Sequence, residues 1–436
     1  MFNKILIANR GEIAVRIIRA CRNMGIRSVA VYSKEDEKSL HVQLADQRIC
    51  IGEGPAKNSY LNMDRIISAA MNMGADAIHP GFGFLSENSE FVRKCEEHGI
   101  TFIGPKADVI DKMGNKSQAR TTMMEAGVPV VPGTKEPVYD AVIGKELADK
   151  IGYPVMIKAS SGGGGKGMRV ARDGDEFESQ FNMAQMESAN AFGDDTMYIE
   201  KYIENPRHVE IQIIADNFGN VVALGDRDCS VQRNHQKLIE ESPSPAITEE
   251  VRAEMNRCAV LAAKTVGYTN AGTIEYIVDA SGDFYFMEMN TRIQVEHGVT
   301  EMVTGTDLII EQIRVAMNEP LSFSQEDVLF RGHAIECRIN AEIPEKNFMP
   351  SPGVVENIHL PAGNGVRVDT ALYTGYRIPT EYDSMIAKVI VHAPNREAAI
   401  MKMRSALDEM VILGVDTNLD FQYQIMKHPV FKEGRA

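Results

Sequence analysis

Two carboxylates and a row of polar side chains share segment 271–301, which could hold a metal ion beside an anion. The segment reads AGTIEYIVDASGDFYFMEMNTRIQVEHGVTE, in which two apolar strands flank a turn. With a four-residue loop, Glu275 faces Phe286 and lies on the same strand face as Glu288. Asn290 continues that face, so two carboxylates and an amide offer the hard oxygen ligands that suit Mg²⁺.

The polar row continues past Asn290 if the chain stays extended. Arg292, Gln294 and Glu296 then follow at every second position. An arginine can grip an anion with two N–H groups, and a glutamate can act as a general base. A solvent-exposed strand would show the same alternation, but this row continues directly from the aromatic Phe284 and its members differ in chemical type. We interpret it as an anion site beside the metal ligands.

A run of four glycines predicts a second site for anionic oxygens. The stretch reads KASSGGGGKGMRV from Lys158 to Val170, and backbone N–H groups without side chains can approach phosphate closely. It is not a Walker A loop, because Lys166 precedes Gly167 and the next residues read as a strand. A strand, glycine and strand pattern with Lys158 before it indicates a lid over phosphates. The alternative is an unstructured hairpin tip.

Three further clusters are ambiguous by themselves. The first is DCSVQRNHQK, which ends at Lys237 and is followed by two glutamates. The second is EKYIENPRH, from Glu200 to His208, and the third is ECRIN, which contains Arg338. Solvated loops or structural ion pairs would explain each of them as well as a ligand site would.

The elements that must position these residues fall into three parts. Residues 1–114 alternate short β-branched strands with amphipathic helices, which predicts a doubly wound parallel sheet. No G-x-G-x-x-G motif follows any of those strands, so a dinucleotide-dependent dehydrogenase is not expected. Residues 115–330 mix strands, hairpins and helices, with the lid at about 131–203, and residues 331–436 are rich in strands and then helical. The predicted fold class is therefore α/β and α+β.

Composition narrows the function classes. The formal net charge is −15, which disfavours nucleic acid and anionic lipid as partners. No apolar stretch approaches the length of a membrane span, and the N-terminus does not resemble a signal peptide. The six cysteines form no C-x-x-C pair. We expect a cytoplasmic protein that binds neither nucleic acid nor membrane.

Taken in order, the motifs resemble those of the biotin carboxylase family of the ATP-grasp superfamily. The motifs are ANRGEIAVRIIRAC, HPGFGFLSEN, MGNKSQAR, KASSGGGGKGMRV, EKYIENPRHVEIQ, RDCSVQRNHQK, EMNTRIQVEH and GHAIECRINAE, and they cover nearly the whole chain. The resemblance implies a central ATP-grasp domain with a glycine-rich lid between the N-terminal and C-terminal domains. It implies carboxylation of biotin by bicarbonate, with ATP as substrate and Mg²⁺ or Mn²⁺ as the metal.

The resemblance also implies roles for individual residues. ATP binding is assigned to Lys116, Lys158, Gly163, Gly164, Gly165, Gly167, Glu200, Lys201, Ile203, His208, Gln232, His235, Glu275 and Glu288. Metal binding is assigned to Glu275, Glu288 and Asn290, and bicarbonate binding to Lys237, Arg292, Gln294, Val295 and Glu296. Arg338 and Phe82 are assigned to the biotin side, and the catalytic residues are Glu296 as general base, Arg338, Lys237 and Arg292.

The implied partners are a biotin carboxyl carrier protein, carboxyltransferase subunits and a second copy of the chain in a homodimer. The resemblance favours the carboxylase component of bacterial acetyl-CoA carboxylase, in fatty acid synthesis. A component of another acyl-CoA or pyruvate carboxylase, a different ATP-grasp ligase and a non-catalytic scaffold are the alternatives. Three residues depart from the family's motifs: Phe82 replaces a tyrosine, Asn234 an arginine and Gly298 a proline.

One motif imitates a biotin attachment site. Met401-Lys402-Met403 resembles the core of such a site, in which the lysine stands on an exposed hairpin. Here Asn395 can cap a helix, and apolar residues from Ala399 to Met410 repeat at helical spacing. We therefore predict that Lys402 lies on an amphipathic helix and carries no biotin.

Overall fold

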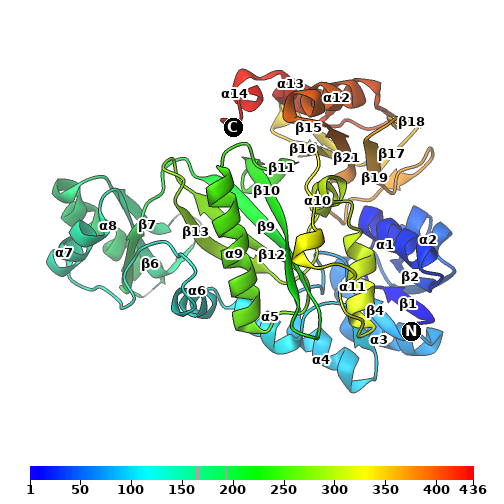
Figure 1. Ribbon diagram of the computed structural model, residues 1–436, viewed down its shortest axis with the longest axis horizontal. Coiled ribbons are helices and arrows are strands. Elements are labelled where there is room, and N and C mark those ends of the chain that lie inside the picture. The colour runs from blue at the N-terminus through cyan, green and yellow to red at the C-terminus, as the bar shows by residue number, and fades with distance from the viewer. Residues whose placement is uncertain (164–165, 193) are drawn as a thin grey trace. The chain divides into compact units, whose positions relative to one another are not determined.

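The computed structural model describes residues 1–163, 166–192 and 194–436 and contains two compact units (Figure 1). The larger unit comprises Met1–Val128, Arg207–Tyr276 and Glu288–Ala436. The smaller unit comprises Pro129–Pro206 and Ile277–Met287. The mixed α/β and α+β class predicted from the sequence is confirmed.

The N-terminal part of the larger unit is a five-stranded sheet in the order β3-β2-β1-β4-β5, with every pairing parallel. Its elements are β1 (Lys4–Ile7), α1 (Gly11–Asn23), β2 (Arg27–Ser33), α2 (Leu40–Leu44), β3 (Gln47–Gly52), α3 (Met63–Met73), β4 (Ala77–His79), α4 (Ser89–Glu97), β5 (Thr101–Phe102), α5 (Ala107–Gly114) and α6 (Lys116–Glu125). Ile13, Ile17 and Cys21 form one apolar stripe of α1 that is buried in the core. This burial explains why the periodic sequence forms a helix there.

An eight-stranded sheet joins the central and C-terminal sequences, in the order β13-β12-β9-β10-β11-β14-β21-β19. Its central elements are β9 (Arg207–Ala215), β10 (Val221–Arg233), β11 (Gln236–Ser242), α9 (Glu249–Val266), β12 (Asn270–Val278), β13 (Phe284–Asn290), α10 (His297–Thr304) and α11 (Leu308–Ala316). β11 pairs antiparallel with β14, so Glu240 lies opposite Glu336. Residues from both sides of the boundary predicted near residue 330 therefore share one sheet.

The C-terminal sequence adds strands to this sheet and covers them with helices. Its elements are β14 (His333–Asn340), β15 (Glu342–Ile343), β16 (Met349–Pro350), β17 (Gly353–Val354), β18 (Asn357–His359), β19 (Val366–Thr370), β20 (Arg377–Ile378), β21 (Met385–Ala393), α12 (Arg396–Glu409), β22 (Val411–Leu413), α13 (Leu419–Lys427) and α14 (Pro429–Lys432). The Asn395 side chain accepts a hydrogen bond from the Ala398 N–H at 2.9 Å, so the predicted cap of α12 is confirmed. Ala399, Met403 and Leu407 from α12 enter the core beneath the helix.

The smaller unit is a three-stranded antiparallel sheet with two helices. Its elements are α7 (Ala141–Ile151), β6 (Val155–Gly163), β7 (Lys166–Ala171), α8 (Gly174–Phe192) and β8 (Met197–Lys201), and the strand order is β7-β6-β8. The predicted strand, glycine and strand pattern is confirmed, because β6 and β7 pair on the two sides of the glycine run. Gly164 and Gly165, two of the predicted ATP-binding residues, lie outside the described residues.

Two local expectations about segment 271–301 are wrong. The Asp279 N–H donates to the Asp283 carbonyl at 2.9 Å, which leaves a three-residue loop in place of the assumed four-residue loop. The chain also does not stay extended after Asn290, because β13 ends there. Residues 291–296 form an irregular turn instead, and α10 begins at His297.

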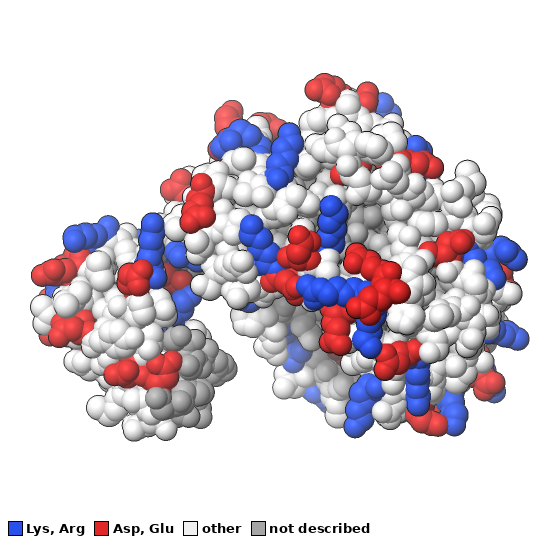
Figure 2. All heavy atoms as spheres, turned by 90° about the horizontal axis from the view of Figure 1, so that it is seen from below, with Lys and Arg blue, Asp and Glu red and all other residues white. Residues whose placement is uncertain are grey.

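Within the described residues, no helix is long and apolar enough to cross a membrane. Charged side chains of both signs are interspersed on the face of the molecule that Figure 2 shows. On that face, the excess of acidic residues forms no extended surface of one sign.

Candidate active site

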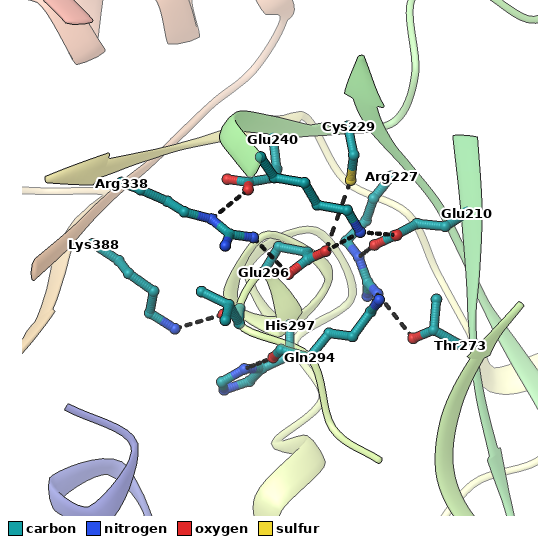
Figure 3. A network of polar contacts seen from close by, with 12 residues as sticks. Glu210, Arg227, Cys229, Glu240, Thr273, Gln294, Glu296, His297, Arg338 and Lys388 are labelled. Atoms are coloured by element: carbon teal, nitrogen blue, oxygen red, sulfur yellow. Dashed lines mark hydrogen bonds and ion pairs between the residues drawn. The ribbon is translucent and has the colours of Figure 1, made fainter. Parts of the chain in front are cut away.

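Glu296 is held between two cationic side chains in the larger unit (Figure 3). Its Oε1 accepts a hydrogen bond from Lys237 Nζ at 2.6 Å, and its Oε2 accepts one from Arg338 Nη2 at 3.0 Å. Glu296 directly precedes α10, Lys237 lies on β11 and Arg338 lies on β14. The irregular turn after β13 therefore brings the predicted base, lysine and arginine together, although the predicted extended strand does not exist.

Lys237 contacts two more carboxylates. Its Nζ donates to Glu210 Oε2 at 2.6 Å and to Glu275 Oε1 at 3.0 Å. All of these side chains are buried or nearly so, and each ammonium hydrogen has an acceptor. Burial works to lower the pKa of Lys237, but the surrounding negative charges outweigh it and raise this pKa well above its ordinary value. Lys237 is therefore fully charged at neutral pH.

The same positive charges act on Glu296. Burial works to raise its pKa, but Lys237 and Arg338 together with the buried Arg227 hold it well below the ordinary value. Glu296 is thus ionised, which is the form that a general base requires. It is a weak base while both cations contact it, because protonation would break two charge-assisted hydrogen bonds.

Arg227 fixes the predicted bicarbonate residue Gln294. Arg227 is fully buried, and its guanidinium donates to Gln294 Oε1 at 2.6 Å and to Glu210 Oε1 at 2.6 Å (Figure 3). Gln294 in turn donates from Nε2 to Glu275 Oε1 at 2.8 Å. The orientation of the Gln294 amide follows from these two partners, because only its oxygen can accept from an arginine.

Arg338 has a second carboxylate partner on its other side. Its Nε donates to Glu240 Oε1 at 2.6 Å. Glu240 is fully buried opposite Glu336, and neither Glu336 oxygen has a hydrogen-bond partner within the described part of the chain. Burial raises the pKa of Glu240 to about 7 despite the opposing effect of Arg338. Burial also raises the pKa of Glu336 well above its ordinary value.

Arg292 lies at the edge of this cluster and is held by a residue of the N-terminal motif HPGFGFLSEN. Arg292 Nε donates to Glu87 Oε2 at 2.9 Å, and its Nη2 donates to Asn290 Oδ1 at 2.9 Å. Glu87 also accepts from the Thr291 N–H at 2.9 Å, so one carboxylate fixes two consecutive residues of the turn. Arg292 and Asn290, which the sequence places next to each other in the row of polar side chains, are therefore in contact.

The predicted metal ligands are close in the chain but have different contacts. Glu275 Oε1 accepts from Asn290 Nδ2 at 2.9 Å, whereas Glu288 Oε2 lies 3.4 Å from Lys116 Nζ. The Glu288 side chain is 40% exposed, so its oxygens remain accessible to a hydrated cation. Two carboxylates and an amide oxygen fit the donor preference of Mg²⁺. The contact of Glu275 with Asn290 brings together two of the three predicted ligands, and no direct contact between Glu275 and Glu288 is observed among the described residues.

His208 and Gln232 belong to the same network, whereas His235 does not. His208 Nε2 lies 2.9 Å from Glu275 Oε2, and Gln232 Nε2 lies 3.1 Å from His208 Nδ1. His235 is exposed at the turn between β10 and β11. Asn234 and His235 both have positive φ, at 49° and 64°, and asparagine tolerates this conformation better than most residues. Asn234 is therefore compatible with the geometry of this turn.

The smaller unit holds the other residues assigned to ATP binding. Lys158 Nζ contacts Glu200 Oε2 at 2.6 Å, which joins two predicted residues from β6 and β8. Lys201 Nζ donates to the carbonyls of Gly152 and Tyr153, both at 2.9 Å. The remaining members of this set are Gly163 at the end of β6, Gly167 on β7 with φ of 71°, and the half-buried Ile203.

The other two departures from the family motifs are Gly298 and Phe82, and nothing in the structure explains Phe82 in place of tyrosine. A Cβ atom on Gly298 would lie 2.4 Å from the end of the Ile390 side chain, so a larger residue here would require that side chain to shift. The Phe82 carbonyl accepts from Asn9 Nδ2 at 2.7 Å, and the aromatic side chain packs at the edge of the core around α1. The sequence does not reveal that Phe82 is tied to the N-terminal strand through its backbone.

Five polar residues of the cluster were not predicted from the sequence, namely Glu87, Glu210, Arg227, Glu240 and Lys388. Four of them, Glu87 excepted, are fully buried on strands. A charge inside an otherwise apolar strand, as in HVEIQIIA or MIAKVIVHA, is the signal that could have identified Glu210 and Lys388. A buried charge requires an oppositely charged or polar partner, and other residues of the site are these partners.

Comparisons with known proteins place these observations in a family. Three family profiles match successive parts of the chain. They are "Biotin carboxylase, N-terminal domain" at residues 1–110, "Carbamoyl-phosphate synthase L chain, ATP binding domain" at 115–324 and "Biotin carboxylase C-terminal domain" at 336–436.

Curated relatives match over the full chain. Biotin carboxylase 1 of Bacillus subtilis is 59% identical over 435 residues, which are 100% of this chain and 97% of the relative. A pyruvate carboxylase subunit of Methanothermobacter thermautotrophicus is 54% identical over 434 residues, covering 100% of this chain and 88% of the relative.

Solved structures share the fold. The biotin carboxylase domain of a thermophilic 2-oxoglutarate carboxylase bound to ADP superposes with a TM-score of 0.96 at 50% identity, covering 100% of this chain and 96% of that one. The biotin carboxylase subunit of pyruvate carboxylase gives a TM-score of 0.94 at 51% identity, with the same coverage.

Proposed function

The chain belongs to the biotin carboxylase family, and we propose that it carboxylates biotin with ATP and bicarbonate through the cluster around Glu296. The observation that carries this proposal is the Glu296 carboxylate, which is bound on one oxygen by Lys237 and on the other by Arg338. Bicarbonate is an anion that must lose a proton during the reaction. A buried cluster of one base and two cations offers both the positive charge that attracts the anion and the group that accepts its proton.

Bicarbonate binding would convert Glu296 from a weak base to a stronger one. The incoming anion binds Arg292 and competes with Glu296 for Lys237, and the hydrogen bond that Glu296 thereby loses raises its pKa toward the ordinary range. Glu296 then removes the bicarbonate proton, and a bicarbonate oxygen attacks the γ-phosphorus of ATP as ADP leaves. The product is carboxyphosphate. Orientation by Lys237 and Arg292 supplies much of the rate, because the two anions repel each other in water.

We assign the nucleotide to the residues predicted from the family motifs. Lys116 and Lys158 are among these residues, and their positive charges suit phosphate oxygens. Mg²⁺, held by Glu288 and Glu275 with Asn290, supplies further neutralisation of phosphate charge when bound. Glu288 is the best placed of these ligands for a hydrated ion, because its side chain is partly exposed and has a single described cationic neighbour.

Arg338 is the residue we assign to biotin. Carboxyphosphate breaks into CO₂ and phosphate, the phosphate accepts the ureido N–H proton of biotin, and the ureido nitrogen attacks CO₂. Negative charge develops on the ureido oxygen during this step, and the Arg338 guanidinium stabilises it. Arg338 is held on one side by Glu240, so it is already oriented before biotin arrives.

We further propose that biotin is delivered by a biotin carboxyl carrier protein and that a carboxyltransferase partner uses the product. Acetyl-CoA is our first candidate for the final acceptor, with the chain acting as a homodimer in the cytoplasm. The similarity to biotin carboxylases over the whole chain and the six free cysteines support this view. One relative is named as a pyruvate carboxylase subunit, so an oxoacid is the alternative acceptor.

ADP formation tests the assignment of Arg338. With ATP, Mg²⁺ and bicarbonate, free biotin should stimulate ADP formation by the wild type, and Arg338→Gln should abolish that stimulation while slow bicarbonate-dependent hydrolysis remains. Arg257→Gln, on the exposed face of α9, is the matched control. Biotin stimulation that survives in Arg338→Gln would contradict the assignment. Supplying purified transferases with acetyl-CoA or an oxoacid then identifies the acceptor.

A further inference from the structure

Lys388 is a fully buried lysine that binds the backbone of the candidate site (Figure 3). It lies on β21, and its Nζ donates a hydrogen bond to the Val295 carbonyl at 2.6 Å. Val295 stands between Gln294 and Glu296 in the irregular turn that follows β13. A buried ammonium group is costly unless it makes specific contacts, so its place beside this turn calls for an explanation.

Lys388 and Arg338 act on neighbouring residues of the same turn. They are direct cross-strand partners in the pairing of β14 with β21. Arg338 binds the Glu296 side chain, and Lys388 binds the carbonyl of the residue before it. One fixes the carboxylate and the other fixes the backbone from which that carboxylate projects.

Two acidic side chains lie beside Lys388. Glu12 Oε1 on α1 lies 3.4 Å from Nζ, and Asp369 Oδ2 on β19 lies 3.6 Å from it. Asp369 also binds Arg367, whereas Glu12 has no hydrogen bond to either oxygen within the described residues. Burial works to lower the pKa of Lys388, but Glu12, Glu336 and Asp369 outweigh it, so the pKa is raised and the lysine is charged.

This arrangement gives a role to Glu12, the acidic residue of the ANRGEIAVR motif. Glu12 comes from the N-terminal sequence, Lys388 from the C-terminal sequence and Val295 from the central sequence. All three lie in the larger unit. The position of the Glu296 turn therefore depends on one lysine that contacts all three parts of the chain.

We propose that Lys388 is a positioning residue that fixes the 294–296 turn through the Val295 carbonyl, with Glu12 as its counter-charge. The inference rests on the proposed function, because it assigns the turn to bicarbonate. Lys388 touches no reacting atom in this account. It acts by holding Gln294 and Glu296 where the substrate anion meets them.

Lys388→Met should lower kcat/KM for bicarbonate by about 10- to 100-fold, the scale on which misplacement of reacting groups acts, and leave KM for ATP within about 2-fold. Lys402→Met is the matched control, because Lys402 Nζ also donates to two carbonyls, of Asn364 and His392, away from the turn. It should leave kcat/KM for bicarbonate unchanged. The double variant Glu12→Gln/Lys388→Met removes the unpaired carboxylate, so it should recover thermal stability without recovering bicarbonate kinetics.

Amide hydrogen exchange provides a measurement that does not require turnover. Exchange in a peptide spanning residues 293–298 should increase in Lys388→Met and in the double variant, but not in Lys402→Met. Unchanged exchange in that peptide would overturn the proposal, as would bicarbonate kinetics that recover together with stability in the double variant. A wild type without bicarbonate-dependent turnover would instead contradict the proposed function, and the exchange result would still decide the role of Lys388.

Discussion

Lys237 and Arg338 bind opposite oxygens of Glu296, at 2.6 and 3.0 Å, and thereby hold the predicted base ionised but weakly basic. The pKa of Glu296 lies well below its ordinary value because of these charges. A substrate anion that takes over Lys237 strengthens the base at the moment when it is needed. The same groups therefore bind the substrate and control the proton transfer.

Replacement of Glu296 by glutamine should abolish most bicarbonate-dependent turnover while ATP binding is kept. The amide cannot accept the bicarbonate proton, so kcat should fall by at least about 10²-fold, the usual scale for a positioned base. Steady-state ADP formation and nucleotide binding by calorimetry measure the two properties. Glu301→Gln is a control for loss of a buried carboxylate in α10. A Glu296→Gln enzyme that keeps most of its rate would show that another group removes the proton.

Glu288→Gln should weaken the dependence of ATP hydrolysis on Mg²⁺. A neutral amide oxygen attracts the cation less than a carboxylate does, so the Mg²⁺ concentration for half-maximal rate should rise by about 10-fold or more. A magnesium titration at saturating ATP measures this shift. Glu204→Gln, which removes an exposed carboxylate paired with Arg172, should leave the titration unchanged. Identical titrations for wild type and Glu288→Gln would refute the metal assignment.

The contact of His208 with Glu275 predicts a pH-dependent contribution to stability. Burial works to lower the pKa of His208, but Glu275 outweighs it and the pKa is raised. A raised histidine pKa contributes stability that is fully present below about pH 6.5 and is lost as pH rises through the folded-state pKa. Glu275→Gln should therefore reduce the free energy of unfolding more at pH 6 than at pH 9, by about 1 kcal/mol.

Urea unfolding at the two pH values measures this difference. Glu254→Gln, which removes a carboxylate paired with Arg257 on α9, is the control. A difference between wild type and Glu275→Gln that stays constant, or that grows with pH, would show that the imidazole is not stabilised as a cation.

Lys402 should stay unmodified when the chain is expressed with an active biotin ligase. Lys402 lies on α12 and its Nζ is engaged by the Asn364 and His392 carbonyls at 2.9 and 2.6 Å, whereas a ligase needs a free lysine on a hairpin. Intact-mass spectrometry should show no biotin adduct, and turnover should require free biotin or added carrier protein. A biotinylated Lys402 that supports its own carboxylation would overturn delivery by a separate carrier.

The sequence predicts well what depends on local pattern. The parallel N-terminal sheet, the strands on both sides of the glycine run and the Asn395 cap follow from periodicity and turn chemistry, and the structure contains each of them. The family motifs also select Glu296, Lys237 and Arg338, which the structure brings into contact.

The remainder depends on contacts between distant segments. The assumed four-residue loop fails because the Asp279 to Asp283 hydrogen bond closes a shorter one, a choice that the sequence DASGD does not settle. Glu87 holds Arg292 from 205 residues away, a separation that periodicity within a single segment does not reveal. Lys388 and Glu240 sit inside strands that otherwise read as core, and their partners appear only when the sheet is assembled.

Transfer of labelled carbon from bicarbonate to biotin tests the central claim most directly. The purified chain is incubated with ATP, Mg²⁺, free biotin and [¹⁴C]bicarbonate, and acid-labile label on biotin is measured beside ADP. Our account predicts ATP-dependent label on biotin in the wild type and none above background in Glu296→Gln. ADP formed without label on biotin, or label on biotin that persists in Glu296→Gln, would contradict it.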